Sequence, residues 1–234
     1  YMGYHLRKRF IRRTYGSIKN RGTLKSSKQL RRDLYKGVNY IVQWDMRKFY
    51  PSIDKDKLKE LIRRKIKGEA ALRLMNKIID AYKPKMKRGI SIGALPSQTN
   101  GNWMLTPFDY FCLDTMKVHF YERNVDDIVM GFRTKEEIAE KIPRMKAFVE
   151  TLGVTVGKLI VFPVEKQKVS FCMYMHEKGH TELRPKPMRR FSKLLNHLEN
   201  HPEEPIRERS RVCSYLGFLK HCDSYNILKE KRHE

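Results

Sequence analysis

The spacing of apolar positions divides the first third of the chain into a strand and two amphipathic helices. Val38–Trp44 is rich in β-branched and aromatic residues and predicts a strand that delivers Asp45 to its end. Asp54 is a favourable helix N-cap, and apolar residues at helical spacing predict helices over about 54–67 and 69–82. These apolar stripes are typical of core packing and carry no chemistry of their own.

A loop and a third helix follow. Gly89–Pro96 contains two glycines and a proline and predicts a loop. Ser97 is a suitable N-cap for a helix that runs to about Lys117 and bends near Pro107. Gly93 would let a backbone approach a ligand closely, although such a loop is more often a plain connection.

The stretch His119–Phe132 predicts a β-hairpin. Two apolar runs flank a short polar centre that ends in adjacent acids, Asp126 and Asp127. Neighbouring carboxylates at a hairpin tip repel each other unless a positive charge lies between them, and a divalent metal ion is the usual solution. An isolated Asp pair in a turn is nevertheless more often structural, because Asp is a favoured turn residue.

The second half of the chain begins with a capping box, Thr134–Glu137, which predicts a helix ending at Gly153. The pattern then predicts three short strands, at Leu159–Val164, Val169–Met175 and His180–Arg184. A turn at 177–179 joins the last two strands as a hairpin.

Basic helical segments are expected at both ends. From Pro187 the chain reads as a small helical appendage, with a break at 202–205 and a second helix from Ile206. Residues 1–36 are very basic and contain two helical pieces separated by a loop at 16–22. The whole order predicts an α+β fold in which an antiparallel sheet is backed by helices on one face.

Composition adds a class of partner. The 234 residues include 50 Lys and Arg against 26 Asp and Glu, a net charge of +24 that indicates a polyanion partner, foremost nucleic acid. No apolar run approaches the roughly 20 residues of a membrane-spanning helix, and no signal-peptide pattern opens the chain, so we expect no membrane partner. Four cysteines without C-x-x-C spacing indicate reduced thiols in a cytoplasmic protein. Because Tyr1 already lies inside a basic pattern, we expect residues upstream of it.

Three acids carry the candidate chemistry. Asp45 at a strand end and Asp126 and Asp127 at a hairpin tip, about 80 residues further on, are the set that a two-metal site requires. Two ions roughly 3.5–4 Å apart would activate an attacking hydroxyl and steady a leaving pyrophosphate. We therefore expect these carboxylates to converge on two Mg²⁺ ions, for which Mn²⁺ can substitute, and to run nucleotidyl transfer.

With these residues in view, the sequence resembles reverse transcriptases over about residues 10–225. WDMRKFYPSI resembles the first palm motif of that family, with Asp45 as metal ligand. SIGALPSQ resembles the loop and helix that cradle the nascent base pair and template, and NVDDIV resembles the hairpin aspartates. Val169–Tyr174 is similar to the primer-grip hairpin.

The resemblance implies roles for further residues. Phe49 and Tyr50 would line the nucleotide site, with Tyr50 at the aromatic gate that excludes a 2′-hydroxyl. Gly93, Ser97 and Gln98 would shape the templating pocket. The primer and template would be contacted by Asn124, Phe171 and Tyr174.

Three basic residues are expected near the phosphates. Lys158 would protonate or steady the pyrophosphate. Lys19 and Arg21 would meet an incoming triphosphate or the template backbone, or they belong to a solvated basic face; the sequence leaves both readings open. Two positions depart from the family pattern, since Asn124 stands where Tyr is usual and Met173 where Gly is common.

The resemblance also implies a right-hand polymerase. It would have partial fingers over 1–36, a palm over 37–185 with finger elements at about 55–95, and a small helical thumb over 186–234. The implied partners are template RNA, a DNA or RNA primer and dNTPs. The motif I-G-x-x-x-S-Q at 92–98 and the closing SYLGFLKHCDSYN resemble bacterial diversity-generating retroelement enzymes, which copy a template RNA with errors at adenines, helped by a small basic accessory protein. A cytoplasmic protein, bacterial or phage-encoded, is implied.

Two alternatives stay open. One is a different reverse transcriptase lineage, such as a retron, a group II intron or a phage-defence enzyme. The other is a polymerase-like module that holds RNA in a larger particle without chemistry. Such a module would bind RNA in a salt-sensitive way that is indifferent to the three acids.

Overall fold

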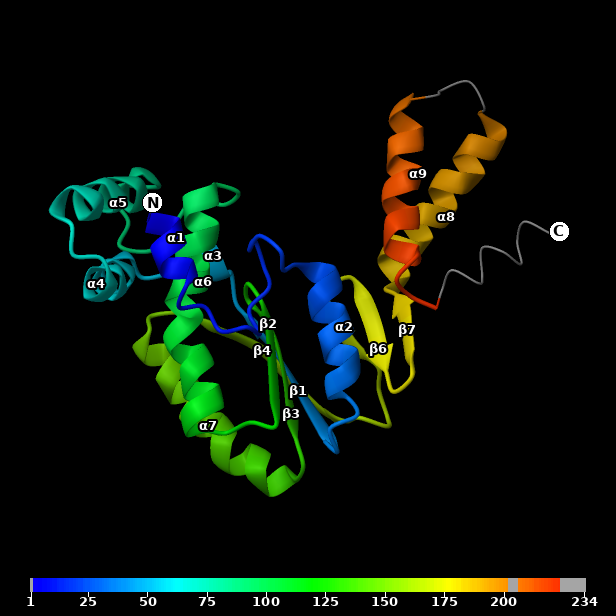
Figure 1. The fold of residues 1–234 in the computed structure, drawn as a ribbon, viewed down its shortest axis with the longest axis horizontal. Helices are drawn as coiled ribbons and strands as arrows, with labels where there is room; N and C mark the ends of the chain where they lie inside the picture. Colours follow the sequence, from blue (N-terminus) through cyan, green and yellow to red (C-terminus); the bar gives the residue numbers. More distant parts are fainter. Residues whose placement is uncertain (1, 202–205, 224–234) are drawn as a thin grey trace.

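A four-stranded antiparallel sheet forms the centre of the structure, with its strands in the order β2–β3–β1–β4. The strands are β1 (Tyr40–Met46), β2 (Phe120–Asn124), β3 (Asp127–Phe132) and β4 (Val156–Pro163). This computed structural model describes residues 2–201 and 206–223, and Figure 1 shows how its elements are arranged. The predicted α+β fold, an antiparallel sheet backed by helices, is confirmed.

Two long helices, α6 (Leu95–Tyr110) and α7 (Lys135–Thr151), cover one face of this sheet. Trp44 of β1 packs edge-on against Phe108 of α6, with the ring centroids 5.7 Å apart. Met145 of α7 belongs to the same buried cluster. This cluster is larger than the one on the opposite face, so it forms the main core. Each of its large apolar side chains contributes about 1.5–3 kcal/mol when fully buried.

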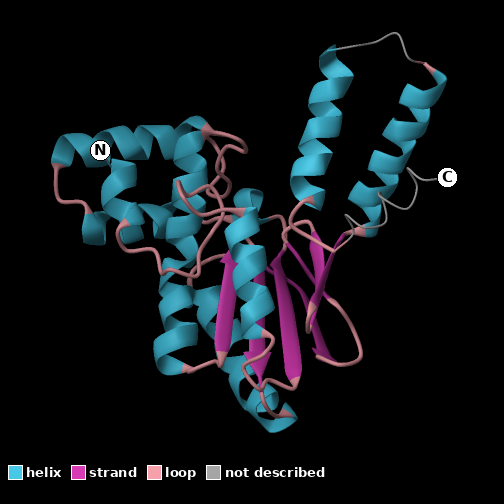
Figure 2. Ribbon diagram, turned by 45° about the vertical axis from the view of Figure 1, so that its right-hand side comes forward, coloured by secondary structure: helices cyan, strands magenta, loops and turns pink. Residues whose placement is uncertain are grey.

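The opposite face of the sheet is covered by α2 (Thr23–Asp33), whereas the sequence led us to expect helices on one face only. Leu30 and Leu34 pack with Ile41 of β1 and Val129 of β3 in a second buried cluster. Figure 2 shows helices on both sides of the strands. The continuous apolar runs of β1 and β3 are typical of strands that are buried on both faces.

A further layer of helices lies beside α6. It consists of α4 (Lys55–Lys65) and α5 (Glu69–Ala81), with the short helices α1 (Met2–Arg7) and α3 (Phe49–Ser52) nearby. The Asp54 carboxylate caps α4 as predicted, because it accepts hydrogen bonds from the backbone N–H groups of Asp56 and Lys57 at 3.0 and 3.1 Å.

The ends of the two long helices follow local sequence signals. Helix α6 begins at Leu95 rather than at Ser97, because Pro96 fits a first helical turn, where its missing N–H costs nothing. Past Pro107 the chain changes into a π-helical turn, η1 (Phe111–Thr115), close to the predicted end. The predicted cap of α7 is confirmed, since the Thr134 hydroxyl accepts a hydrogen bond from Glu137 N at 3.2 Å.

A second, smaller sheet follows β4. Its strands are β5 (Val169–Phe171), β6 (Tyr174–Glu177) and β7 (His180–Leu183), paired antiparallel in that order. The prediction of one strand over 169–175 was wrong, because the chain turns at Cys172 and Met173, with φ angles of 48° and 76°. This turn lets Phe171 and Tyr174 pair across the hairpin with both side chains buried.

The described chain ends in a pair of helices, α8 (Pro185–Asn200) and α9 (Ile206–Leu219), which project away from the sheets in Figure 1. The rings of Phe191 and Tyr215 stack with centroids 5.0 Å apart and hold the pair together. The predicted helical appendage is therefore present, but the expected break at 202–205 and the predicted features at 224–234 lie outside the described residues. Among the described helices, none is long and apolar enough to cross a membrane.

Candidate active site

Asp45 and Asp127 lie directly opposite each other on the neighbouring strands β1 and β3. Opposed residues of an antiparallel pair point to the same face of the sheet, with their Cβ atoms about 4.5–5.5 Å apart. Asn124 pairs with Asp127 across β2 and β3, so Val125 and Asp126 form a two-residue turn between these strands. The structure thus brings the three predicted acids to one end of the central sheet.

The pKa values of all three acids are raised, and for Asp126 and Asp127 the charge of a neighbouring acid contributes. Burial, followed by the charges of Asp126 and Asp45, raises the pKa of Asp127 to about 7. The pKa of Asp126 is raised by burial and by the charge of Asp45, and that of Asp45 is raised by burial. Like charges in so small a volume oppose ionisation, and a bound cation would relieve that repulsion.

Neither Asp45 nor Asp127 has a side-chain hydrogen bond or ion pair with any described residue. Asp45 is exposed and Asp127 is half-buried, whereas the fully buried Asp33 is paired and accepts from Arg13 at 2.6 Å. Carboxylate oxygens are the donors that Mg²⁺ and Mn²⁺ prefer, so the chemistry of this set fits such ions. The described residues nevertheless contain no group of three His, Cys, Asp or Glu side chains already spaced to hold a metal.

Lys158 is exposed on β4, the strand on the other side of β1. The β1–β4 pairing shifts between Trp44 and Met46, so that Gly157 and Lys158 lie beside Asp45 in an irregular stretch. A Cβ atom on Gly157 would lie 2.3 Å from the Asp45 carbonyl oxygen, and only glycine allows this close approach. Sequence reasoning missed Gly157, although an isolated glycine in a strand is a known signal of such contact.

Phe49 and Tyr50 follow β1 in the short helix α3, with their ring centroids 5.4 Å apart. Phe49 is buried in the main core, behind the half-buried Tyr50. Burial raises the pKa of the Tyr50 hydroxyl, and the charge of Asp126 raises it further, which places Tyr50 close to the acids. Of the two aromatic residues, Tyr50 is therefore the one at the site.

The predicted templating residues lie at the start of α6. Ser97 is buried in its first turn, Gln98 is half-buried, and Gly93 lies in the exposed loop before it with φ of 86°. One turn further along, a Cβ atom on Gly101 would lie 3.1 Å from the ring of Tyr50. The first half of α6 therefore packs next to Tyr50.

The structure separates Lys19 from Arg21. Lys19 is exposed in the loop before α2. The guanidinium of Arg21 donates to the carbonyl oxygens of Ile11 and Thr14 at 2.5 and 2.8 Å, so it holds the N-terminal segment in place. This arrangement does not support the predicted contact between Arg21 and a triphosphate, because the guanidinium is used within the fold.

The predicted primer residues differ in position. Asn124 is at the hairpin tip beside Asp127, whereas Phe171 and Tyr174 are buried. The turn between these two buried residues carries Met173, whose carbonyl accepts from Arg184 N at 2.9 Å. The charge of Arg184 acts to lower the pKa of Asp127, so Arg184 lies near the acids. Sequence reasoning missed this arginine because one more basic residue is no signal in so basic a chain.

Arg184 also lines a groove of about 520 Å³ at the base of the helical pair. The groove is lined by Met173, Arg184, Lys186, Pro187, Arg190, Arg211, Ser214, Tyr215 and Phe218. Guanidinium and ammonium groups beside aromatic rings are suited to a nucleic-acid backbone and its bases. The groove therefore extends the candidate site from the acids toward α8 and α9.

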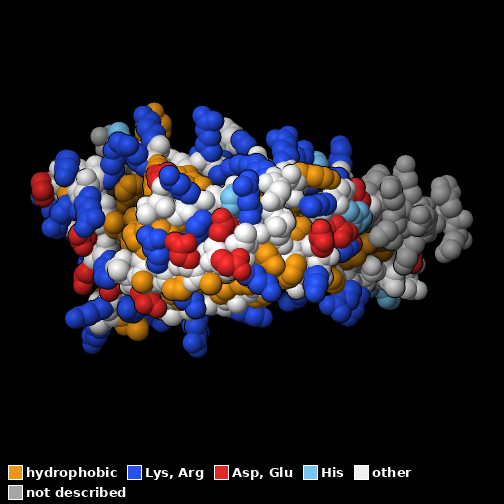
Figure 3. Space-filling view, turned by 90° about the horizontal axis from the view of Figure 1, so that it is seen from below, with side chains coloured by type: hydrophobic (Ala, Val, Ile, Leu, Met, Phe, Trp, Pro, Cys, Tyr) orange, Lys and Arg blue, Asp and Glu red, His pale blue; other side chains and the backbone are white. Residues whose placement is uncertain are grey.

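Positive charge elsewhere is spread over the surface. The face in Figure 3 carries many Lys and Arg side chains with fewer acids among them. A net charge of +24 favours attraction of polyanions in general, and in the groove basic and aromatic side chains lie together near the acids.

The sheet, its helices and the hairpin with paired acids define a reverse-transcriptase-like fold, and comparison with solved structures agrees. The telomerase of Candida tropicalis lacking its C-terminal domain matches with a TM-score of 0.60 and 15% identity, over 78% of this chain and 44% of that chain. The telomerase of Candida albicans in complex with a TWJ fragment of telomeric RNA matches with a TM-score of 0.60 and 11% identity, over 79% of this chain and 37% of that chain.

A third structure, the Candida tropicalis telomerase with a TWJ fragment of telomeric RNA, covers 94% of this chain at 15% identity and a TM-score of 0.57. The chain spans less than half the length of each of these telomerase chains. At such identities the likeness shows the fold. No protein-family profile matches the sequence, and no curated protein matches it.

Proposed function

We propose that this protein is an RNA-directed DNA polymerase that works by nucleotidyl transfer. The observation that carries the proposal is the opposition of Asp45 and Asp127 on adjacent strands, with Asp126 in the adjoining turn. These acids have no ionic partner among the described residues, although the chain has a net charge of +24 and a reverse-transcriptase-like fold. We therefore expect them to serve metal-dependent chemistry on a polyanion.

In this proposal Asp45, Asp126 and Asp127 hold two Mg²⁺ ions, or Mn²⁺ in their place. Bound ions of this kind supply positive charge that activates a primer hydroxyl and neutralises the leaving pyrophosphate. Lys158, exposed beside Asp45 on β4, adds a positive charge near the leaving group. The acids orient the ions, and the lysine acts on the phosphates.

Other side chains would position the substrates. Tyr50 packs against the sugar of the incoming dNTP and excludes a 2′-hydroxyl, since its ring lies close to Asp126. Gly93, Ser97 and Gln98, at the start of α6, shape the pocket for the templating base. Phe49 supports Tyr50 from the core.

The primer and template would lie against the hairpin tip and the basic groove. Asn124 and the turn at Met173 contact the primer end, while Arg184, Arg190 and Arg211 bind phosphates. Phe171 and Tyr174 act indirectly, because their buried side chains fix this turn. In polymerase terms, residues 1–36 and 55–95 are fingers, the rest of 37–185 is the palm, and 186–234 is the thumb.

The finer assignment is to an enzyme of the diversity-generating retroelement type, which would copy a template RNA with errors at adenines beside a small basic accessory protein. It is supported by the motif at 92–98, which lies in the loop and first turn of α6. A retron, group II intron or phage-defence enzyme is the competing lineage. A nearby repeat pair in the genome that differs at template adenines would decide for the retroelement.

Primer extension on a defined RNA template with Mg²⁺ tests the proposal. Asp126→Ala and Asp45→Ala should abolish extension, because each removes a metal ligand. Asp114→Ala is the matched control, since Asp114 is exposed in η1. Extension by Asp126→Ala at the level of the parent would refute the assignment.

The second candidate function is an RNA-binding module without chemistry. It is favoured by the lack of a ready-made metal cluster in the described residues and by the structural use of Arg21. It predicts RNA binding that weakens steeply with salt and is the same in Asp126→Ala as in the parent, together with no extension by either protein.

A further inference from the structure

Arg123 is a buried charge that lies beside the acidic turn. It is the fourth residue of β2, two positions before Val125, and its side chain is 0% exposed. Its Nε and Nη2 atoms donate to the two carboxylate oxygens of Asp109 on α6, at 2.6 and 2.5 Å. Such a two-point pair fixes the plane of the guanidinium as well as its position.

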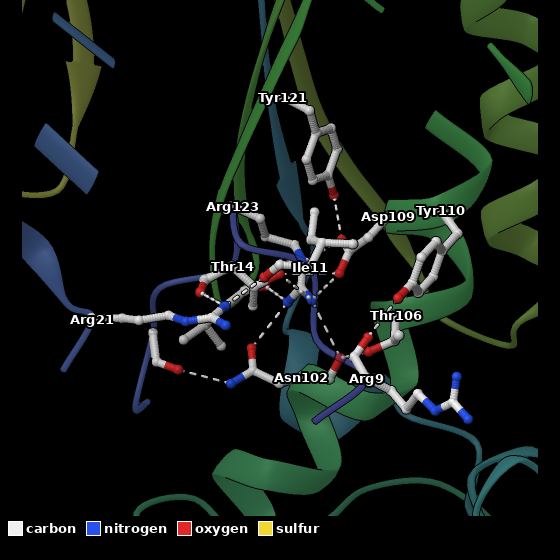
Figure 4. Close-up of polar contacts among 12 residues, drawn as sticks. Arg9, Ile11, Thr14, Arg21, Asn102, Thr106, Asp109, Tyr110, Tyr121 and Arg123 are labelled. Atoms are coloured by element: carbon white, nitrogen blue, oxygen red, sulfur yellow. Dashed lines mark hydrogen bonds and ion pairs between the residues drawn. The ribbon is translucent and has the colours of Figure 1, made fainter. Parts of the chain in front are cut away.

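The remaining donor of Arg123 reaches the turn itself. Its Nη1 atom donates to the Val125 carbonyl at 2.9 Å and to the Asn102 side-chain oxygen at 3.0 Å. Asn102 in turn donates to the Gly16 carbonyl at 2.8 Å. Figure 4 shows how this one guanidinium joins α6, the β2–β3 hairpin and the N-terminal segment.

The N-terminal segment closes over the same turn. Tyr15 N donates to the Arg123 carbonyl at 3.0 Å, so the segment runs alongside β2. A Cβ atom on Gly16 would lie 2.3 Å from Cγ2 of Val125 and 2.9 Å from Oδ1 of Asn124. Only glycine therefore allows the segment to lie this close to the turn.

Val125 itself has a backbone conformation that a β-branched residue rarely adopts, with φ of 62°. Strained residues of this kind persist when the surrounding structure determines them, and they cluster at functional sites. The Arg123 hydrogen bond on one side and Gly16 on the other supply that determination. Asp126 is the next residue along the chain.

We propose that Arg123, oriented by Asp109 and Asn102, acts with Gly16 to position the Val125–Asp126 turn, so that Asp126 and Asp127 face Asp45. The proposal rests on the proposed function, in which these acids bind metal ions. Arg123 is a positioning residue, because it is buried and acts through the turn. A buried ion pair is weak evidence for stability but is well suited to fixing one geometry.

The test is to disturb the turn without touching the ion pair. Gly16→Ala places a methyl group against Val125, and Val125→Gly in the same chain removes the side chain that it meets. Gly68→Ala is the matched control, because its Cβ would meet only the Ala71 side chain at an ordinary 3.9 Å. If Gly16→Ala fails to fold, Asn102→Ala replaces it, since this change removes the link to Gly16 and leaves the Arg123–Asp109 pair intact.

Two quantities are measured for each protein: Mn²⁺ binding followed by electron paramagnetic resonance, and kcat and KM in primer extension. Gly16→Ala should weaken Mn²⁺ binding about tenfold, equivalent to about 1.4 kcal/mol, and lower kcat with little change in KM for the primer and template. The double variant should recover most of both losses, and Gly68→Ala should match the parent.

The outcomes separate the two proposals. If the parent binds Mn²⁺, Gly16→Ala weakens that binding and no protein extends primers, the proposed polymerase function fails and the positioning role stands. If the parent extends primers and Gly16→Ala keeps its Mn²⁺ affinity and kcat, the positioning role is refuted. A double variant as impaired as Gly16→Ala would refute it too, because the loss would then not arise from contact with Val125.

Discussion

The hydroxyl of Tyr174 on β6 donates a 3.1 Å hydrogen bond to the carbonyl of Phe218 on α9. This bond ties the helical pair to the small sheet, and Tyr174 is buried in the cluster that also contains Leu219. The same tyrosine follows directly after the turn at Met173. The orientation of α8 and α9 and the position of that turn are therefore coupled through one side chain.

Tyr174→Phe should loosen the helical pair while leaving the central sheet intact. The loss of one buried hydrogen bond costs about 1 kcal/mol and leaves the Phe218 carbonyl without this donor. Amide hydrogen exchange in α9 should become several-fold faster. Tyr110→Phe is the control, because it removes a comparable 2.9 Å bond to Arg9 far from α9; equal exchange in the two variants would contradict the coupling.

The groove arginines are expected to bind phosphates. Arg190→Gln and Arg211→Gln should each weaken RNA binding and reduce the slope of log K against log salt by about 1. Arg144→Gln, at a surface ion pair with Glu140 on α7, should leave the slope unchanged. If the three variants behave alike in filter binding at several salt concentrations, phosphate binding is not localised in the groove.

Gly157→Ala should break the approach of β4 to β1. Its Cβ would lie 2.3 Å from the Asp45 carbonyl and 2.7 Å from Arg47 N, and neither backbone atom can move without disturbing the sheet. We expect a loss of about 2–3 kcal/mol in the free energy of unfolding, measured with urea. Full stability in this variant would show that β4 can shift away without cost.

His176 makes stability depend on pH. Its burial, followed by the nearby charge of Arg31, lowers the pKa of His176 to about 4 in the folded protein, against 6.5 as the ordinary value. Between these values the unfolded chain binds a proton that the folded chain does not, so stability falls as the pH decreases from about 6.5 to 4. The full effect is about 3 kcal/mol.

His176→Gln removes this titration. Unfolding by urea at pH 7 and at pH 4.5 should show a smaller loss of stability in the variant than in the parent, and other titrating groups cancel in this comparison. Equal losses in the two proteins would mean that His176 is protonated without cost in the fold.

The candidate acids could be predicted because strand and turn signals are local. The apolar run before Asp45 and the hairpin pattern around Asp126 and Asp127 were sufficient to place all three at sheet ends. Whether the two segments lie side by side depends on strand order, which no local signal in the sequence gives; in the structure β1 and β3 are neighbours.

Other features carry no local signal. The turn at Cys172 and Met173 contains no glycine, proline or asparagine, so an apolar pattern that continues through it was interpreted as one strand. Arg21 and Arg123 look in the sequence like any other basic residue of a basic chain. Their structural roles appear only when their hydrogen-bond partners, distant in the sequence, are known.

The opposition of Asp45 and Asp127 has one further consequence. Their separation is set by backbone pairing between two adjacent strands, which fixes neighbouring chains about 4.8 Å apart whatever connects them. The long connection through α4 and α5 can therefore gain or lose residues without moving one carboxylate relative to the other. Evolution is free to remodel that excursion while the spacing of the two carboxylates stays constant.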